Sequence, residues 1–503
     1  MKAKVTVHEQ FRKGKVDDRF FGSFVEYLGR SIYGGIYDPG HPTANAQGFR
    51  RDVMDVTREL RIPIIRYPGG NFVATYDWED GIGPVEKRPA RLDLAWKAVE
   101  TNRVGLHEFA QWAQDVSAEI LMTVNLGTRG VREALNLFEY CNHPGGSYWS
   151  DLRRKNGQEE PFNVRHWCLS NELDGVWQVG QKTAYEYGRL ANETAKAMKL
   201  LDSSVKLCAC GSSFRRMPTF LEWDQTVLDL CYDTIDYLSL HSYLRNAERD
   251  PDTYLAESMD MEEMIDLTVK MCDCVKGRKK SPRTIDISFD EWNVWPRAKE
   301  DDRFIDPWRI APPLLEETYT MEDAVAFGCM LNVLFRHADR VKIACLSMLV
   351  NVFGPLMTEN GGALWKQTIF YPFSYASRYG RGDSLDVRLD SPGYQNKVYG
   401  HVPFVDVSAV YSEERKEVVF FAVNRSRAES VVLETNLSGF QKASMVEHVI
   451  LDSKEPGTSN TKSAPNAVMP RTAAAARMEG AAARVSLPPL SWNMLRFSVS
   501  GLD

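Results

Sequence analysis

Short apolar runs recur along residues 18–378, and a helical pattern separates each run from the next. Eight runs are apolar nearly throughout, as strands covered on both faces are. Between them lie amphipathic stretches such as "LHEFAQWAQDVSA", with apolar residues at helical spacing. This alternation predicts an α/β fold, a (β/α)8 barrel over residues 18–378. The predicted strands cover residues 20–26, 62–70, 119–127, 164–172, 205–212, 235–243, 284–292 and 342–351.

The alternative α/β fold is an open, doubly wound sheet. That fold binds nucleotides through a glycine-rich phosphate loop after its first strand. No such loop follows residues 20–26, so the pattern favours the barrel.

The pattern changes after residue 378, where helical periodicity disappears. Runs such as "KEVVFFAVNRS" and "SVVLETNLSG" predict a C-terminal antiparallel β-sandwich of jelly-roll type over residues 379–503. The N-terminal "KAKVTV" is a lone strand, and we expect residues 1–17 to join this sandwich. A polar, alanine-rich interval at 453–482 is expected to be a long surface loop.

Composition narrows the class of protein. Of 503 residues, 44% are hydrophobic and 26% charged, which is typical of a folded globular chain. The net charge of −7 disfavours nucleic acid or an anionic membrane as the main partner. The nine cysteines are an odd number without a C-x-x-C pair, which favours free thiols in a reducing, cytoplasmic compartment. No stretch approaches eighteen apolar residues and the start has no apolar signal segment, so we expect no membrane span and no leader.

Polar residues stand where the predicted barrel strands end, and in such barrels these positions form the active site. Carboxylates on the fourth and seventh strands, Glu172 and Glu291, are expected to face each other across the barrel mouth. Such a pair can cleave a glycosidic bond, one group protonating the leaving oxygen while the other attacks the anomeric carbon. The other end residues are Glu26, Asn71, Asn171, His241, Tyr243 and Asp290.

Regular strand alternation would point Asn171 and Glu172 to opposite sides. Both reach the pocket only if the backbone bends there, and the Asp174-Gly175 turn that follows permits a bend. The structural alternatives are a helix cap for Glu172 and a salt-bridged strand end for Glu291.

Other hydrolytic chemistries have weaker support. A metal hydrolase needs several His and Asp ligands at the strand ends, and His241 alone qualifies. A serine nucleophile would sit in a G-x-S-x-G elbow, which the sequence lacks. We therefore expect no metal and no other cofactor.

The residues resemble the α-L-arabinofuranosidases of glycoside hydrolase family 51 nearly from end to end. The similar stretches are "FVEYLGRSIYGGIYDPGHP", "IRYPGGNFVATYDWEDGIGP", "LAWKAVETNRVG", "WCLSNELDGVWQVG", "IDYLSLHSY", "DEWNVW", "MTENGGALWKQTIFYPF" and "LPPLSWNMLRF". The resemblance implies a retaining double displacement, with Glu172 as acid/base and Glu291 as nucleophile. It implies an exo-acting enzyme that releases terminal α-L-arabinofuranosyl residues from arabinose-containing oligosaccharides, and a homo-oligomer, specifically a hexamer.

The resemblance also implies a set of sugar-binding residues. Asn171 would bond the 2-hydroxyl, a contact that strengthens in an oxocarbenium-like transition state. Trp96 and Trp295 would wall the pocket or stack on the leaving group, although core packing explains either tryptophan equally well. Arg66 would brace Glu26 or Glu291. The implied ligands of the furanose ring are Glu26, Asn71, Asn171, Tyr243 and Gln367.

The chain departs from the family pattern at several positions. Tyr27 stands where His is common and Ser170 where Gly is usual, while "HSYLRN" replaces "HQYYGN". The stretch after Trp295, residues 296–317, borders the expected leaving-group side. These departures leave the leaving group, linkage and parent polysaccharide (arabinan or arabinoxylan) open, but not the reaction type. Two alternatives remain, an endo-acting glucanase-type enzyme and a non-catalytic sugar-binding protein. A long open cleft would indicate the endo-acting enzyme, whereas a blind pocket would indicate the exo-acting one.

Overall fold

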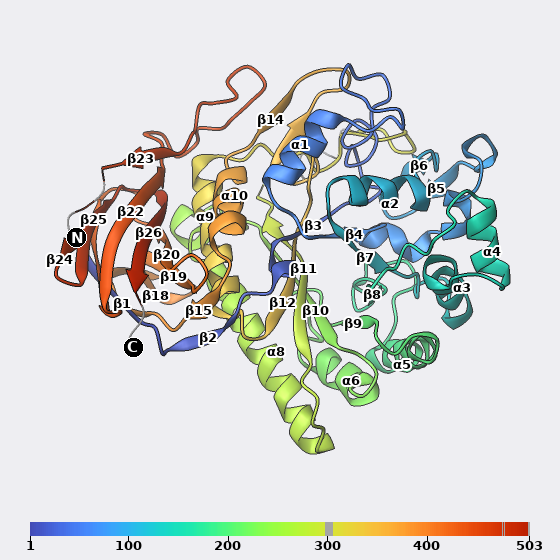
Figure 1. Ribbon diagram of the computed structural model, residues 1–503, viewed down its shortest axis with the longest axis horizontal. Helices are drawn as coiled ribbons and strands as arrows, with labels where there is room; N and C mark the ends of the chain where they lie inside the picture. Colours follow the sequence, from blue (N-terminus) through green and yellow to red (C-terminus); the bar gives the residue numbers. More distant parts are fainter. Residues whose placement is uncertain (297–304, 475, 477, 501–503) are drawn as a thin grey trace.

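A closed barrel of eight parallel strands lies at the centre of the computed structural model (Figure 1), which describes residues 1–296, 305–474, 476 and 478–500. Each strand pairs with the next in chain order, and the last pairs with the first. All eight predicted strands are confirmed, mostly with shorter bounds. They are β3 (Gly22–Phe24), β4 (Ile64–Tyr67), β7 (Glu119–Thr123), β8 (His166–Leu169), β9 (Lys206–Cys210), β10 (Tyr237–Leu244), β11 (Asp286–Val294) and β12 (Val341–Leu346).

A helix follows each barrel strand and packs outside it, because its apolar stripe must be buried against the sheet. The helices are α1 (Arg51–Glu59), α2 (Leu106–Asp115), α3 (Val131–Asn142), α5 (Ala184–Leu201), α6 (Glu222–Cys231), α8 (Ser258–Lys279), α9 (Met321–Arg336) and α10 (Phe370–Tyr379). Among the described residues, no helix is both long and apolar enough to span a membrane.

Side chains of alternate residues fill the barrel interior. On β8, Cys168 points inward, whereas Trp167 and Leu169 belong to the layer beneath the helices. All nine cysteines are free thiols, as the sequence predicted. The small inward set consists of Ile64, Leu121, Cys168, Cys208, Ile343 and Cys345.

The C-terminal part is a sandwich of two main sheets (Figure 1). One has the order β16-β1-β21-β25-β24 and the other β2-β15-β19-β20-β26-β22-β23. As expected, the N-terminal strand β1 (Lys2–His8) joins the sandwich, but it runs parallel to β21 (Val431–Gly439) and is an exception in an otherwise antiparallel sandwich. The domain limits 1–17, 18–378 and 379–503 stay predictions.

The remaining strands of the two sheets are β2 (Arg12–Lys15), β15 (Asp383–Leu385), β16 (Arg388–Asp390), β19 (Val405–Ser412), β20 (Glu417–Asn424), β22 (Lys442–Leu451), β23 (Arg471–Ala473), β24 (Met478–Glu479), β25 (Ala482–Leu487) and β26 (Ser491–Ser500).

The interval 453–482 is more than the surface loop that we predicted. It contains β23 and β24, and its Asn460 is fully buried. The Asn460 amide donates to the carbonyl oxygens of Lys366 and Val468, at 3.1 and 3.0 Å. The interval is therefore anchored to the segment that follows β12.

Helix α9 joins the barrel to the sandwich. It contacts β11 on one side and β19, β20 and β26 on the other, so residues 324–335 are buried all around the helix. Gly328 allows this close approach, because a Cβ there would lie 2.6 Å from Trp492. Asp406 of β19 accepts hydrogen bonds from Asn332 and Arg336 of α9, at 2.8 and 2.9 Å.

Candidate active site

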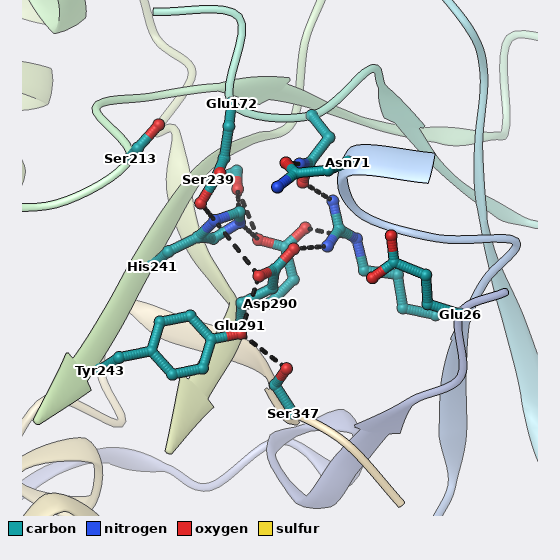
Figure 2. Close-up of polar contacts among 12 residues, drawn as sticks. Glu26, Asn71, Glu172, Ser213, Ser239, His241, Tyr243, Asp290, Glu291 and Ser347 are labelled. Carbon is teal, nitrogen blue, oxygen red and sulfur yellow. Dashed lines mark hydrogen bonds and ion pairs between the residues drawn. The ribbon is translucent and has the colours of Figure 1, made fainter. Parts of the chain in front are cut away.

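The carboxyl ends of the barrel strands bring most of the predicted site residues together (Figure 2). Glu172 follows β8 and Glu291 lies on β11. One carboxylate oxygen of each, together with a ring nitrogen of His241, all lie within 4.8 Å of one another. The two carboxylates therefore face the same small space.

The backbone bends where Asn171 and Glu172 leave β8, as we expected. Ser170 has φ 76° and Glu172 has φ 45°, so the strand alternation is broken on both sides of Asn171. On β11 the register with β10 shifts between the pairs Ser239–Ser288 and His241–Glu291, which is a β-bulge. Asp290 and Glu291, the consecutive residues at this bulge, are both buried.

Glu291 is held at both carboxylate oxygens. Arg66 Nη1 donates to Oε1 at 2.5 Å, and the Tyr243 hydroxyl donates to Oε2 at 2.8 Å. The phenol also meets the Ser347 hydroxyl at 2.7 Å (Figure 2). Gly70 is necessary here, because a Cβ at that position would lie 2.7 Å from Glu291 Oε1. The carboxylate is thus fixed in place with its charge paired.

Glu172 has different neighbours. Trp177 Nε1 donates to Oε2 at 2.7 Å, and His241 Nδ1 lies 2.8 Å from Oε1. Trp177 is 42% exposed and stacks on Phe214, with ring centroids 5.7 Å apart. Phe214 belongs to the segment after β9, where Ser213 bonds Asp174 through its hydroxyl and its backbone N–H. Glu172 therefore lies at the edge of an exposed aromatic pair.

His241, Asp290 and Ser239 form a buried support beneath the two carboxylates. From the sequence we named His241 and Asp290 as strand-end residues without a role, and we did not name Ser239. Asp290 accepts a hydrogen bond from Ser239 and lies 3.4 Å from His241 Nε2 and from Arg66 Nε. Burial opposes protonation of His241, but Glu291, Asp290 and Glu172 raise its pKa well above the ordinary value. Two cations, Arg66 and His241, thus balance the acidic groups. His241 and Asp290 could be found from the sequence because both stand at the ends of predicted strands.

Glu26 lies across the site from Glu172 (Figure 2). Its Oε1 accepts hydrogen bonds from the Phe72 backbone N–H at 2.8 Å and from Trp96 Nε1 at 3.0 Å. Burial, together with the charge of Glu291, raises the pKa of Glu26 to about 8. Trp96 therefore supports the site through a polar contact as well as by packing.

The two asparagines are linked to each other and to Arg66. Asn171 Nδ2 donates to Asn71 Oδ1 at 3.0 Å, and Arg66 Nη2 donates to Asn171 Oδ1 at 2.7 Å. Arg66 is thus a brace for Glu291 and Asn171. Trp295 lies against Tyr243, with ring centroids 5.7 Å apart.

Gln367 is placed differently from the other predicted ligands. Its amide donates to the carbonyl oxygens of Glu317 and Gly354, and its Oε1 accepts from the Tyr319 backbone N–H. Both amide hydrogens are therefore committed to the backbone, which leaves only an oxygen lone pair for a sugar.

Tyr27 and Ser170, which depart from the family pattern, have different surroundings. The Tyr27 hydroxyl is buried and bonds Tyr67 and the Val104 carbonyl oxygen, so it lies in an aromatic cluster and not beside the two carboxylates. Ser170 accepts a hydrogen bond from the Leu126 backbone N–H at 3.3 Å. Of the stretch after Trp295, residues 297–304 lie outside the described residues.

The donor atoms do not suit a metal ion. Glu172, His241 and Glu291 are close enough together to ligate one, as are Cys168, Cys208 and Asp290. However, the raised pKa of His241 leaves its ring without a lone pair to donate. Arg66 already pairs with both Glu291 and Asp290, so a further cation would meet strong repulsion.

A closed (β/α)8 barrel with two facing carboxylates at the carboxyl ends of its strands defines a glycosidase-type barrel. Comparisons with known proteins identify the family. Residues 56–261 match the model of the α-L-arabinofuranosidase 1 domain, and residues 290–491 match that of the α-L-arabinofuranosidase C-terminal domain. The chain belongs to the α-L-arabinofuranosidases of glycoside hydrolase family 51.

Individual relatives are similar over almost their whole length. An intracellular exo-α-(1→5)-L-arabinofuranosidase from Halalkalibacterium halodurans is 52% identical over 98% of both chains. An exo-α-(1→6)-L-arabinofuranosidase from Bifidobacterium longum is 44% identical, over 97% of this chain and 96% of the relative. The solved structure of a family 51 α-L-arabinofuranosidase from Bifidobacterium longum superposes with a TM-score of 0.94 at 41% identity, covering 98% of this chain and 99% of that one.

Proposed function

We propose that this protein is an exo-acting, retaining α-L-arabinofuranosidase. The observation that carries the proposal is the pair Glu172 and Glu291, whose nearest oxygens lie within 4.8 Å. Retaining enzymes keep their carboxyl groups about 5–5.5 Å apart, whereas inverting enzymes leave roughly 6.5–9.5 Å for a water molecule. The separation therefore supports a double displacement.

The surroundings of the two carboxylates support different roles. Glu291, anchored by Arg66 and Tyr243, is an ionised group held for in-line attack, and we assign it as the nucleophile. Glu172, beside the exposed Trp177, lies where a leaving group would depart, and we assign it as the acid/base. Glu26, Asn71 and Asn171 would bind the furanose hydroxyls.

The proposed reaction has two balanced steps. A Glu291 oxygen attacks the anomeric carbon while the bond to the leaving oxygen breaks, and Glu172 gives that oxygen its proton. Water then attacks the same carbon and gives a proton to Glu172, while the ester bond to Glu291 breaks. The anomeric configuration is inverted twice and so retained.

The substrate class follows from the named relatives. We infer that the protein acts on short arabinose-containing oligosaccharides inside the cell, with the (1→5) linkage favoured because that relative is 52% identical and the (1→6) relative 44%. Assays with (1→5)- and (1→6)-linked arabinofuranosides test the linkage preference. A soluble glucan, assayed alongside them, tests the alternative of an endo-acting glucanase.

Variants of the two glutamates test the mechanism. Glu172→Ala should lower kcat/KM by about 10²–10⁴ on a substrate with a poor leaving group, because no acid assists departure. It should spare formation of the glycosyl-enzyme from an activated aryl furanoside, whose leaving group needs no proton. The intermediate should then accumulate, and azide, a nucleophile that needs no general base, should restore turnover.

Glu291→Ala is the matched comparison, since it should lose activity on both substrates. Steady-state kinetics on paired good and poor leaving groups, with and without azide, give the answer. If Glu172→Ala is equally slow on both substrates and azide has no effect, the acid/base assignment is wrong.

A further inference from the structure

Arg245 lies on the face of Trp295, close to the nucleophile assigned above. It follows the last residue of β10, and its guanidinium carbon is 3.4 Å from the centroid of the Trp295 ring. The same carbon is 5.9 Å from the ring centroid of Tyr243, whose hydroxyl donates to Glu291. The Trp295 backbone N–H donates to the Leu244 carbonyl oxygen at 2.7 Å, which fixes the two segments side by side.

The guanidinium of Arg245 has no ion-pair partner in the part of the chain that the structure describes. The neighbouring Glu257 accepts hydrogen bonds at Oε2 from the backbone N–H groups of Arg245 and Asn246, at 2.8 and 3.3 Å. In contrast, Arg215 and Arg216 of the β9–α6 segment both pair with Asp260. Among the described residues, Arg245 is therefore a cation that its neighbours position but no carboxylate pairs.

The charge of Arg245 is available at neutral pH. Burial against its neighbours lowers its pKa only to about 10, so the group stays protonated. The residue as a whole is nevertheless exposed. A guanidinium stacked on a ring keeps its N–H groups in its own plane, and this fork matches the two oxygens of a carboxylate.

Arg245 lies near both proposed catalytic carboxylates, because it contacts Tyr243, the partner of Glu291, and is affected by the charge of Glu172. Glu172, which would protonate the leaving oxygen, acts electrostatically on Arg245. Since Arg245 covers one face of Trp295, that face is closed to a stacking sugar. A neutral leaving group therefore gains little here, whereas an anionic one gains a charged, two-pronged partner.

We propose that Arg245 and Trp295 form a subsite for a leaving group that carries a carboxylate, namely a uronic acid residue bearing the arabinofuranosyl group. The subsite rests on the function proposed above, because it is defined by the position of the leaving group. It adds selectivity for charge to the cleavage reaction.

A pair of aryl furanosides tests the proposal. The 4-carboxyphenyl and 4-carbamoylphenyl α-L-arabinofuranosides are similar in shape and differ in charge. We expect Arg245→Gln to lower the ratio of their kcat/KM values about tenfold relative to the unmodified protein, as for a charge-assisted hydrogen bond. Comparing ratios between proteins cancels the intrinsic reactivity of the two substrates. The change should lie mainly in KM and shrink at high salt.

Two further variants act as controls. Arg245→Lys should keep part of the preference, because it retains the charge but loses the fork. Arg216→Gln removes a neighbouring arginine that Asp260 already pairs, and it should leave the ratio unchanged. If the ratio of the two kcat/KM values in Arg245→Gln equals that of the unmodified protein, the proposal is wrong.

Inhibition separates a sugar acid from an aromatic acid. Methyl β-D-glucuronide should inhibit hydrolysis of the 4-carbamoylphenyl substrate more strongly than methyl β-D-glucoside, and Arg245→Gln should abolish that difference. Inhibition by benzoate without any by the glucuronide would refute the uronic acid assignment. A protein that hydrolyses neither furanoside contradicts the proposed function itself, whereas an active enzyme whose ratio ignores Arg245 contradicts the subsite alone.

Discussion

Glu26 carries two hydrogen bonds on a single carboxylate oxygen. Oε1 accepts both, from Phe72 and Trp96. Oε2 is directed toward Gly70, since a Cβ at that position would lie 3.4 Å from Glu26 Oε2 and 2.7 Å from Glu291 Oε1. Burial and the charge of Glu291, with a smaller contribution from Asp93, raise the pKa of Glu26 to about 8. The raised pKa favours the protonated form at neutral pH, and Oε2, which accepts neither of these two bonds, is the oxygen placed to donate to a sugar hydroxyl.

This protonation state predicts an alkaline limit of activity. Above about pH 8 Glu26 loses its proton, so it loses its donor and adds a negative charge beside Glu291. We expect kcat/KM to fall there, and we expect Glu26→Gln, whose amide donor does not titrate, to lack this fall. The pH profiles of kcat/KM for both proteins measure the difference. An unchanged alkaline fall in Glu26→Gln would assign it to another group.

The positions of the candidate site residues were not equally predictable from the sequence. The position of Glu172 and Glu291 at the barrel mouth could be predicted because strand ends at the carboxyl face of a barrel are a general location for active sites. The strand-end position of Asp290 was visible in the sequence, but the bulge in β11 that lets Asp290 and Glu291 both be buried was not. The commitment of Gln367 to backbone carbonyls depends on the segment from 317 to 354. Such tertiary contacts between distant segments leave no local signal in the chain.

At the scale of elements, Glu119 ties the beginnings of three barrel segments together. It starts β7 and accepts hydrogen bonds from Arg19, next to β3, at 3.0 Å through each of its two oxygens. His166, at the start of β8, lies 3.4 Å away. These two neighbours lower the pKa of Glu119 to about 2 against the opposing effect of burial. The ionised form is thus favoured in the folded protein.

Glu119→Gln should therefore lower the free energy of unfolding at pH 7. Because Glu119 is half exposed, solvent screening limits the loss to about 0.5–1 kcal/mol. A depressed pKa contributes stability above the unfolded value of about 4.3, and this contribution disappears as the pH falls toward 2. Urea unfolding at several pH values measures it, with the exposed Glu160→Gln as the control. A loss that persists undiminished at low pH would contradict the ionic origin.

Strands could be predicted where both faces are buried, because such a strand is a continuous apolar run. A strand without such a run was missed. The eight barrel strands are covered on both faces and were predicted correctly. In contrast, β22 was missed, because the first half of "KASMVEHVIL" alternates between exposed and half-buried residues. The parallel pairing of β1 with β21 was also not predictable, since nothing near residues 2–8 specifies a partner at residues 431–439.

At the scale of the whole molecule, we expect a closed homo-oligomer. The family resemblance implies a hexamer, and most soluble oligomers of identical chains have such closed symmetry. Light scattering after gel filtration should give a mass about six times the chain mass of 57.1 kDa. A species of 57.1 kDa that persists across dilution would exclude the hexamer.

The position of β1 has a consequence for synthesis of the chain. The amino group of Met1 meets the Ser430 carbonyl oxygen, 429 residues further along, and β1 pairs with β16 and β21. A ribosome that adds about 5–20 residues per second needs roughly 20–90 s to reach that partner. During this time β1 has neither of its sheet partners, although the barrel strands are already available to one another. The sandwich is therefore completed only when β1 meets β21, which is made more than 400 residues later.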